Sequence, residues 1–148
     1  MSCPFCEIVA KRAPASVIYQ DDAIMAFMTL RSFAAGECTI IPIAHIDHFS
    51  DVPDDIAQRI IVAAQRISRR MRTVFAPERV GMIVHGYGVQ HAHLILVPQN
   101  GPNDITSVHY VSIEDGAIRI SLKNIPFTPR DVLDEHARLL SDNSGPTG

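Results

Sequence analysis

The run Val89–Pro98 (VQHAHLILVP) constrains the fold more than any other segment of the chain. It is rich in apolar residues and ends at a proline, which is typical of a central β-strand. Side chains alternate along a strand, so His91, His93, Ile95 and Val97 are predicted to share one face, while the residues between them point into the core. At a rise of about 3.3 Å per residue, the two imidazoles would stand about 6–7 Å apart on that face.

The remaining segments predict an α+β fold with a mainly antiparallel sheet. Residues 54–75 carry apolar side chains at steps of three and four, which is typical of one long amphipathic helix. A last helix is expected over 128–140, with Thr128 as its N-cap and Pro129 at its first position. Other expected elements are a short helix within 4–12, strands at 17–20, 23–28, 38–42 and 79–85, and a hairpin over 108–122 around Asp115-Gly116.

The composition is that of a globular domain and not of a disordered chain. The chain has 148 residues, 47% of them hydrophobic, and a net charge of −3. We expect one domain over 1–140 and a disordered polar tail over 141–148. The charge argues against nucleic-acid or membrane-surface partners, but a small phosphorylated ligand needs only a few local donors. No membrane span or signal peptide is recognised, so a cytoplasmic location is expected.

Two histidines on one strand face suit two kinds of chemistry. A neutral imidazole is both a nucleophile and a metal ligand, and it exchanges protons near neutral pH. Gly86 and Gly88 precede the pair in a loop where the backbone can approach a ligand closely. The simpler interpretation, which the H-x-H pattern alone leaves open, is two hydrogen-bonded strand histidines without a ligand.

Several motifs in order change this balance. The stretch 86–98 resembles the signature of the histidine triad (HIT) family, in which histidines alternate with apolar residues before a proline. Residues 3–9 resemble the family's opening CxFCxI motif, and 36–42 followed by His45 resemble its GHTLVIPxxH motif. Further similarity lies in PAS at 14–16 and YQDD at 19–22. The resemblance implies a five-stranded antiparallel sheet with helices packed on it, and a homodimer.

The resemblance also implies an activity. In HIT enzymes the middle histidine, here His93, attacks the α-phosphate of a nucleotide conjugate and forms a nucleotidyl-histidine that water then releases. The chain would then be a nucleotide-phosphate hydrolase or a nucleotidyl transferase. His91 is the expected second catalytic residue, because its ring can hold the phosphate if it does not bind a metal.

Several positions depart from the family pattern. Ile95 replaces the third histidine, which removes a proton donor worth about 10²–10⁴-fold in rate. Thr29, followed by Leu30, stands where an acidic residue usually holds the ribose. Gly88 replaces a serine of the family, and His85 is the candidate substitute for an asparagine. With Gly86, these residues are the expected substrate-binding set.

The departures leave three functions open. The first is the enzyme just described, acting on a small nucleotide or nucleotide conjugate. The second is a catalytically weakened nucleotide-binding protein, and the third is an interaction dimer stabilised by zinc.

Cysteine spacing points to a metal site. Cys3-x-x-Cys6 has the spacing of a zinc knuckle but supplies only two ligands. Some bacterial HIT proteins complete a tetrahedral structural zinc site with the histidines that correspond to His45 and His91. Two free thiols packed as small apolar groups and a redox dithiol are the alternatives, whereas Cys38 is expected in the core.

Overall fold

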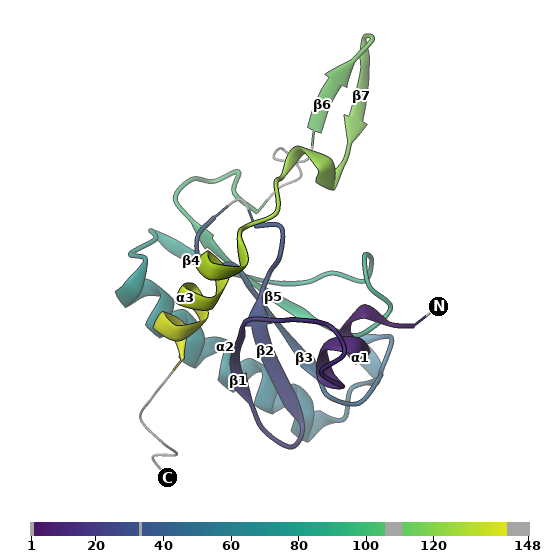
Figure 1. The fold of residues 1–148 in the computed structure, drawn as a ribbon, viewed down its shortest axis with the longest axis vertical. Helices are drawn as coiled ribbons and strands as arrows, with labels where there is room; N and C mark the ends of the chain where they lie inside the picture. Colours follow the sequence, from purple (N-terminus) through teal and green to yellow (C-terminus); the bar gives the residue numbers. More distant parts are fainter. Residues whose placement is uncertain (1, 33, 106–110, 142–148) are drawn as a thin grey trace.

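The computed structural model describes residues 2–32, 34–105 and 111–141 of the chain. One sheet lies at the centre, with the long helix α2 and the helix α3 on one face and the short helix α1 near the other (Figure 1). The helices are α1 (Pro4–Val9), α2 (Asp54–Val74) and α3 (Arg130–Leu140), with short 3-10 helices at Phe49–Asp51 and Leu122–Asn124. No helix within the described ranges is both long and apolar enough to cross a membrane.

The central sheet has five strands, all paired antiparallel, in the order β1-β2-β3-β5-β4. Strand β5 therefore lies between β3 and β4, although α2 and β4 separate it from β3 along the chain. This confirms the α+β class, the five-stranded antiparallel sheet and the three expected helices. The strands are β1 (Val17–Gln20), β2 (Ile24–Met28), β3 (Cys38–Pro42), β4 (Arg79–Val84) and β5 (Leu94–Gln99).

The alternation of side chains divides the sheet into two faces. Even-numbered residues of the inner strands, such as Ile40, Leu94 and Leu96, pack against the apolar stripe of α2 in the main core. Odd-numbered residues, such as Phe27 and Ile41, form a smaller cluster on the opposite face, against α1. The apolar stripe predicted for residues 54–75 is the buried side of α2. Only part of the second face is covered, because α1 is much shorter than α2.

Strands β6 (Val111–Glu114) and β7 (Ala117–Ile120) form a separate hairpin that projects away from the sheet (Figure 1). Asp115 and Gly116 at its turn both have positive φ, 52° and 76°, as expected for a two-residue hairpin loop. The predicted hairpin is confirmed here, while its positions 108–110 lie outside the described residues. Its isoleucines remain exposed, Ile113 at 75% and Ile118 at 72%.

The predicted strand over 89–98 begins later than expected. Strand β5 starts at Leu94, so His91 and His93 precede it and lie outside the ladder. The physical reason is that β4 ends at Val84, opposite Leu94, while Pro42 of β3 has no N–H to donate and its carbonyl accepts from the His91 ring. The alternation nevertheless continues, because Ala92 packs in the core of α2 while both histidines lie on the face of α1.

Two helix boundaries also differ from expectation. Helix α1 ends at Val9, because Lys11 turns the chain with a φ of 59° and the N–H of Arg12 donates back to the Glu7 carbonyl. Helix α3 begins at Arg130 with Pro129 as its N-cap, so Thr128 is not the cap. The N–H of Thr128 instead donates to the Leu30 carbonyl at 3.0 Å and ties this segment to the loop after β2.

The burial pattern generates a stability prediction. Ile40 is 0% exposed in the main core, so Ile40→Ala should lower the free energy of unfolding by about 2–5 kcal/mol. Ile118→Ala removes the same atoms from a side chain that is 72% exposed and should cost no more than about 0.5 kcal/mol. Urea unfolding of both variants checks the ranking, and equal losses would show that the hairpin is packed in solution.

Candidate functional site

His93 lies at the entrance to β5 on the α1 face of the sheet. Its ring is buried, with 7% exposed, and Nδ1 lies 2.7 Å from the backbone carbonyl oxygen of His91. A carbonyl oxygen can only accept a hydrogen bond, so Nδ1 carries the proton. The lone pair of the neutral ring is therefore on Nε2, on the far side of the imidazole from the backbone.

His91 is completely buried, and both of its ring nitrogens have partners. Nε2 donates to the carbonyl oxygen of Pro42, the last residue of β3, at 2.8 Å. That bond leaves the lone pair on Nδ1, which faces the thiols of Cys3 and Cys6 at 3.5 and 3.6 Å. Burial lowers the pKa of His91, which favours the neutral ring that a metal ligand requires.

Four side chains gather around this nitrogen and form the metal-ligating cluster. The Sγ atoms of Cys3 and Cys6 and the Nδ1 atoms of His45 and His91 include contacts of 3.3 to 3.6 Å. One ligand atom from each of the four residues lies within 4.8 Å of the others. These residues come from the start of α1, the loop after β3 and the approach to β5. The sequence prediction that they converge is confirmed, and together they can hold a metal ion.

Thiol chemistry separates this cluster from the third cysteine. Burial, followed by the neighbouring thiol of Cys3, raises the pKa of Cys6. A bound cation would oppose both effects by stabilising the thiolate. Cys38 is fully buried in the main core, and burial strongly raises its pKa, so it is an inert core residue as expected.

Phe5 of α1 packs beside both histidines. Its ring centroid lies 5.5 Å from that of His93 and 5.7 Å from that of His91, with interplanar angles of 80° and 72°. It also contacts Phe27 of β2, edge to face, at 5.4 Å. These are favourable T-shaped arrangements that fill the space beside the imidazoles.

Two of the expected substrate-binding residues lie on the same sheet face, beyond α1. The Thr29 hydroxyl lies 3.1 Å from that of Thr39, which is opposite Ile95 in the ladder between β3 and β5. Ile95 is half-buried and lies two residues after His93, so the two side chains point to the same face. The structure therefore aligns Thr29, Thr39 and Ile95 along one strip of the sheet.

The remaining expected substrate-binding residues are exposed. His85, Gly86 and Gly88 lie in the loop after β4, where Nδ1 of His85 contacts the backbone of Tyr87. Gly88 has a φ of 97°, a conformation that side-chain-bearing residues rarely adopt. Leu30 is 46% exposed in the loop after β2.

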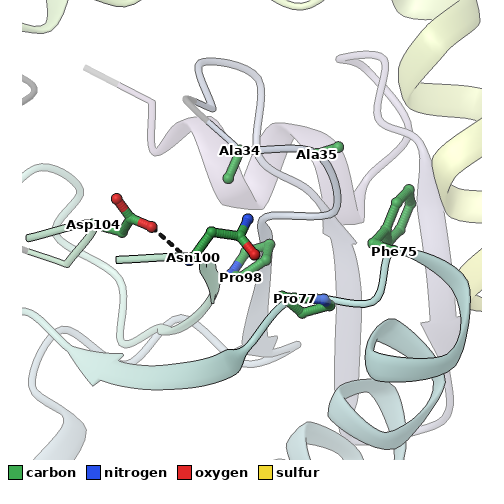
Figure 2. A pocket seen from close by; sticks show the side chains of 7 residues that line it. All are labelled: Ala34, Ala35, Phe75, Pro77, Pro98, Asn100 and Asp104. Atoms are coloured by element: carbon green, nitrogen blue, oxygen red, sulfur yellow. Dashed lines mark hydrogen bonds between the residues drawn. The ribbon is translucent and has the colours of Figure 1, made fainter. Parts of the chain in front are cut away.

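A hollow of about 380 Å³ lies at the other end of β5 (Figure 2). Phe75, Pro77 and Pro98 line it, and the Asp104 carboxylate accepts a hydrogen bond from the backbone of Asn100. Pro98 is five residues from His93 along the chain, close to the full length of the strand. This hollow is therefore not part of the histidine site.

Three groups at the site were not predicted from the sequence. Phe5 and the Pro42 carbonyl act through contacts between distant segments, for which no local pattern exists. Thr39 did carry a signal, because it is the one polar residue in the apolar strand CTIIP, opposite the predicted histidine strand.

Comparison with known proteins agrees with this geometry. The HIT domain family matches residues 10–108. The Hit protein of Bacillus subtilis is 28% identical over 70% of this chain and 74% of its own length. The adenosine 5′-monophosphoramidase of Saccharomyces cerevisiae is 28% identical over 66% of this chain and 63% of its own. The adenylylsulfatase of Arabidopsis thaliana is 21% identical over 66% and 52%.

Solved structures agree as well. A zinc-bound histidine triad family protein from Mycobacterium smegmatis superposes with a TM-score of 0.70 at 27% identity, covering 95% of this chain and 91% of that one. The match of the family over most of the chain, together with the five-stranded sheet and the buried pair of histidines, shows that this protein belongs to the histidine triad family.

Proposed function

We propose that this protein is a nucleotide hydrolase or nucleotidyl transferase that acts at an α-phosphate through a covalent intermediate on Nε2 of His93. The observation that carries the proposal is the 2.7 Å hydrogen bond from Nδ1 of His93 to the His91 carbonyl. It fixes the tautomer in which Nε2 is a free nucleophile, the form that attack on phosphorus requires.

The same bond serves the reaction in a second way. When Nε2 bonds to phosphorus, the ring becomes positively charged, and its Nδ1–H becomes a stronger donor to the His91 carbonyl. The bond between phosphorus and the leaving group breaks, and its electron pair departs with the leaving group. Water then attacks the phosphorus, the Nε2–phosphorus bond breaks, and the nucleoside monophosphate leaves. If another acceptor replaces water, the reaction is a nucleotidyl transfer.

The residue at 95 indicates which leaving groups suit this site. Ile95 cannot protonate a departing amine, and proton donation is worth about 10²–10⁴-fold in rate. The carboxylate of an acyl adenylate or the sulfate of an adenylyl sulfate departs as a stable anion and needs no such proton. We therefore favour mixed anhydrides of a nucleoside monophosphate, the bond type named by the adenylylsulfatase relative, over the phosphoramidates named by the yeast relative.

The ribose contact is the weaker part of the proposed site. Thr29 offers one hydroxyl, already 3.1 Å from that of Thr39, where a carboxylate would grip two ribose hydroxyls. This observation also favours the second candidate function, a protein that binds a nucleotide and turns it over slowly.

The proposal predicts the effect of removing the nucleophile. In the wild type we expect AMP release from adenosine 5′-phosphosulfate to exceed release from adenosine 5′-phosphoramidate. His93→Ala should lower the first rate by at least about 10³-fold, because it removes the covalent route. Chromatographic measurement of AMP gives both rates, and His48→Ala, which changes an exposed histidine, is the matched control.

The outcomes separate the two candidates. Equal rates for the wild type and His93→Ala would exclude the enzyme. Calorimetric binding of AMP without release from any conjugate would establish the binding protein instead.

We further propose that the metal-ligating cluster holds a structural zinc. Zn–S bonds of about 2.3 Å and Zn–N bonds of about 2.05 Å, at the tetrahedral angle, place sulfur and nitrogen about 3.6 Å apart. The contacts in the cluster are 3.3 to 3.6 Å, and its two sulfurs and two imidazole nitrogens leave no open position. When bound, zinc supplies a cross-link between α1 and the histidine segment, and the catalytic chemistry stays with His93.

Elemental analysis checks this assignment. The wild type should contain about one zinc per chain, and Cys6→Ser should lose most of it because a hydroxyl is a poor zinc ligand. Cys38→Ala also removes one thiol, but a buried one outside the cluster, and should retain the metal. A metal-free wild type whose stability does not change with chelator or added zinc would contradict the proposal.

A homodimer through β4 is also proposed. Strand β4 is an outer strand of the sheet, and its Met82 and Val84 are exposed although they face the α2 side. On α2, the buried Ser68 hydroxyl has no hydrogen-bond partner among the described residues. An unpaired strand edge with apolar side chains favours pairing with a second copy.

Light scattering coupled to gel filtration checks the dimer. The wild type should elute with twice the chain mass of 16.3 kDa. Val84→Glu should shift the equilibrium to the monomer, because it places a charge at the proposed interface. Val17→Glu, on the opposite outer strand, is the control and should stay dimeric, and a monomeric wild type would exclude this interface.

A further inference from the structure

We propose that Phe5 is a positioning residue for His93, and that the metal-ligating cluster holds Phe5 in place. The inference rests on the proposed function, since it concerns the same nucleophile. It gives α1 a second role beside supplying thiols to the cluster, namely to hold the His93 ring in position.

The first step is the geometry around the His93 ring. The bond from Nδ1 to the His91 carbonyl restrains one edge of the ring, but a single hydrogen bond still allows the ring to tilt about its axis. The ring of Phe5 lies 5.5 Å away and nearly perpendicular, so it blocks that motion from the side. Phe27, which is on β2, contacts Phe5 and supports its ring from the side of the sheet.

The second step is the weakness of α1 as a helix. It has six residues, none of them fully buried, and its N-cap residue makes no side-chain cap hydrogen bond. A helix of this length is not stable by itself in water, so tertiary contacts must hold it. Those contacts are the small apolar cluster that includes Phe5 and Ile8, and the thiols of Cys3 and Cys6 at the histidines.

The attachment of α1 through its cysteines also determines where Phe5 lies beside His93. Phe5 lies between the two cysteines in the sequence, so any link from both thiols to His45 and His91 fixes the helix turn that carries its ring. The cluster therefore restrains His93 by two routes. One runs through the backbone of His91, and the other runs through Phe5.

The experiment separates these routes by changing Phe5 while the four ligands remain. Phe5→Leu keeps an apolar side chain in the cluster but removes the ring beside His93. We expect unchanged zinc content and a kcat for AMP release about 10-fold lower, with KM changed less than about 3-fold, because the nucleophile is misplaced. In ¹⁵N NMR spectra, the His93 ring nitrogens should change from one fixed tautomer to exchange-broadened or averaged signals.

Ile8→Ala is the matched control, because it removes apolar volume from the same cluster without a ring contact to either histidine. It should keep the wild-type His93 signals and kcat. Phe5→Met is a second variant of similar bulk, with the same expected result as Phe5→Leu if the latter does not fold. Removal of metal from the wild type by a chelator should reproduce the broadened His93 signals.

Each result decides one part of the proposal. Wild-type His93 signals in Phe5→Leu would overturn the positioning role, and so would equal broadening in Ile8→Ala. Unchanged signals after metal removal would overturn the link to the cluster. The NMR readout does not depend on turnover, so an inactive wild type would refute the proposed function without deciding the role of Phe5.

Discussion

The backbone hydrogen bond from Ala92 to the carbonyl of Ile46 is the constraint on which the site depends. At this level β4 has ended and β3 no longer pairs with the chain, so no ladder keeps it extended. The bond to the loop after β3 replaces the ladder for one residue. It keeps Ala92 in the core of α2, and so turns His91 and His93 to the face where α1 lies.

The sequence was sufficient to predict the elements and the face of the histidines, because both depend on local periodicity. The strand at 38–42 and the α2 stripe follow from apolar patterns that need no knowledge of distant residues. The start of β5 could not be predicted, because it depends on where β4 ends and where the pairing with β3 stops. The tautomer of His91 could not be predicted either, since it depends on the backbone carbonyl of Pro42. Every residue has such a carbonyl, so the sequence carries no signal for this contact.

In the proposed function, the site combines a firmly held nucleophile, His93, with few side chains that contact the rest of the substrate. The backbone and buried rings fix His93, and these are properties of the fold. The proposed leaving-group and ribose contacts depend on single side chains, Ile95 and Thr29. In the proposed chemistry, the groups that hold His93 allow the attack on phosphorus. Ile95 and Thr29 decide which compounds react quickly.

His91 forms three interactions with three different groups. Nδ1 faces the thiols, Nε2 donates to Pro42, and the backbone carbonyl accepts from His93. A substitution with a shorter or apolar side chain loses the first two at once and leaves the Pro42 carbonyl and both half-buried thiols without this partner. A change at position 91 is therefore expected to disturb more of the structure than a change at position 95. Loss of the first histidine of the motif would free the start of α1 from the sheet, whereas the last position carries no such attachment.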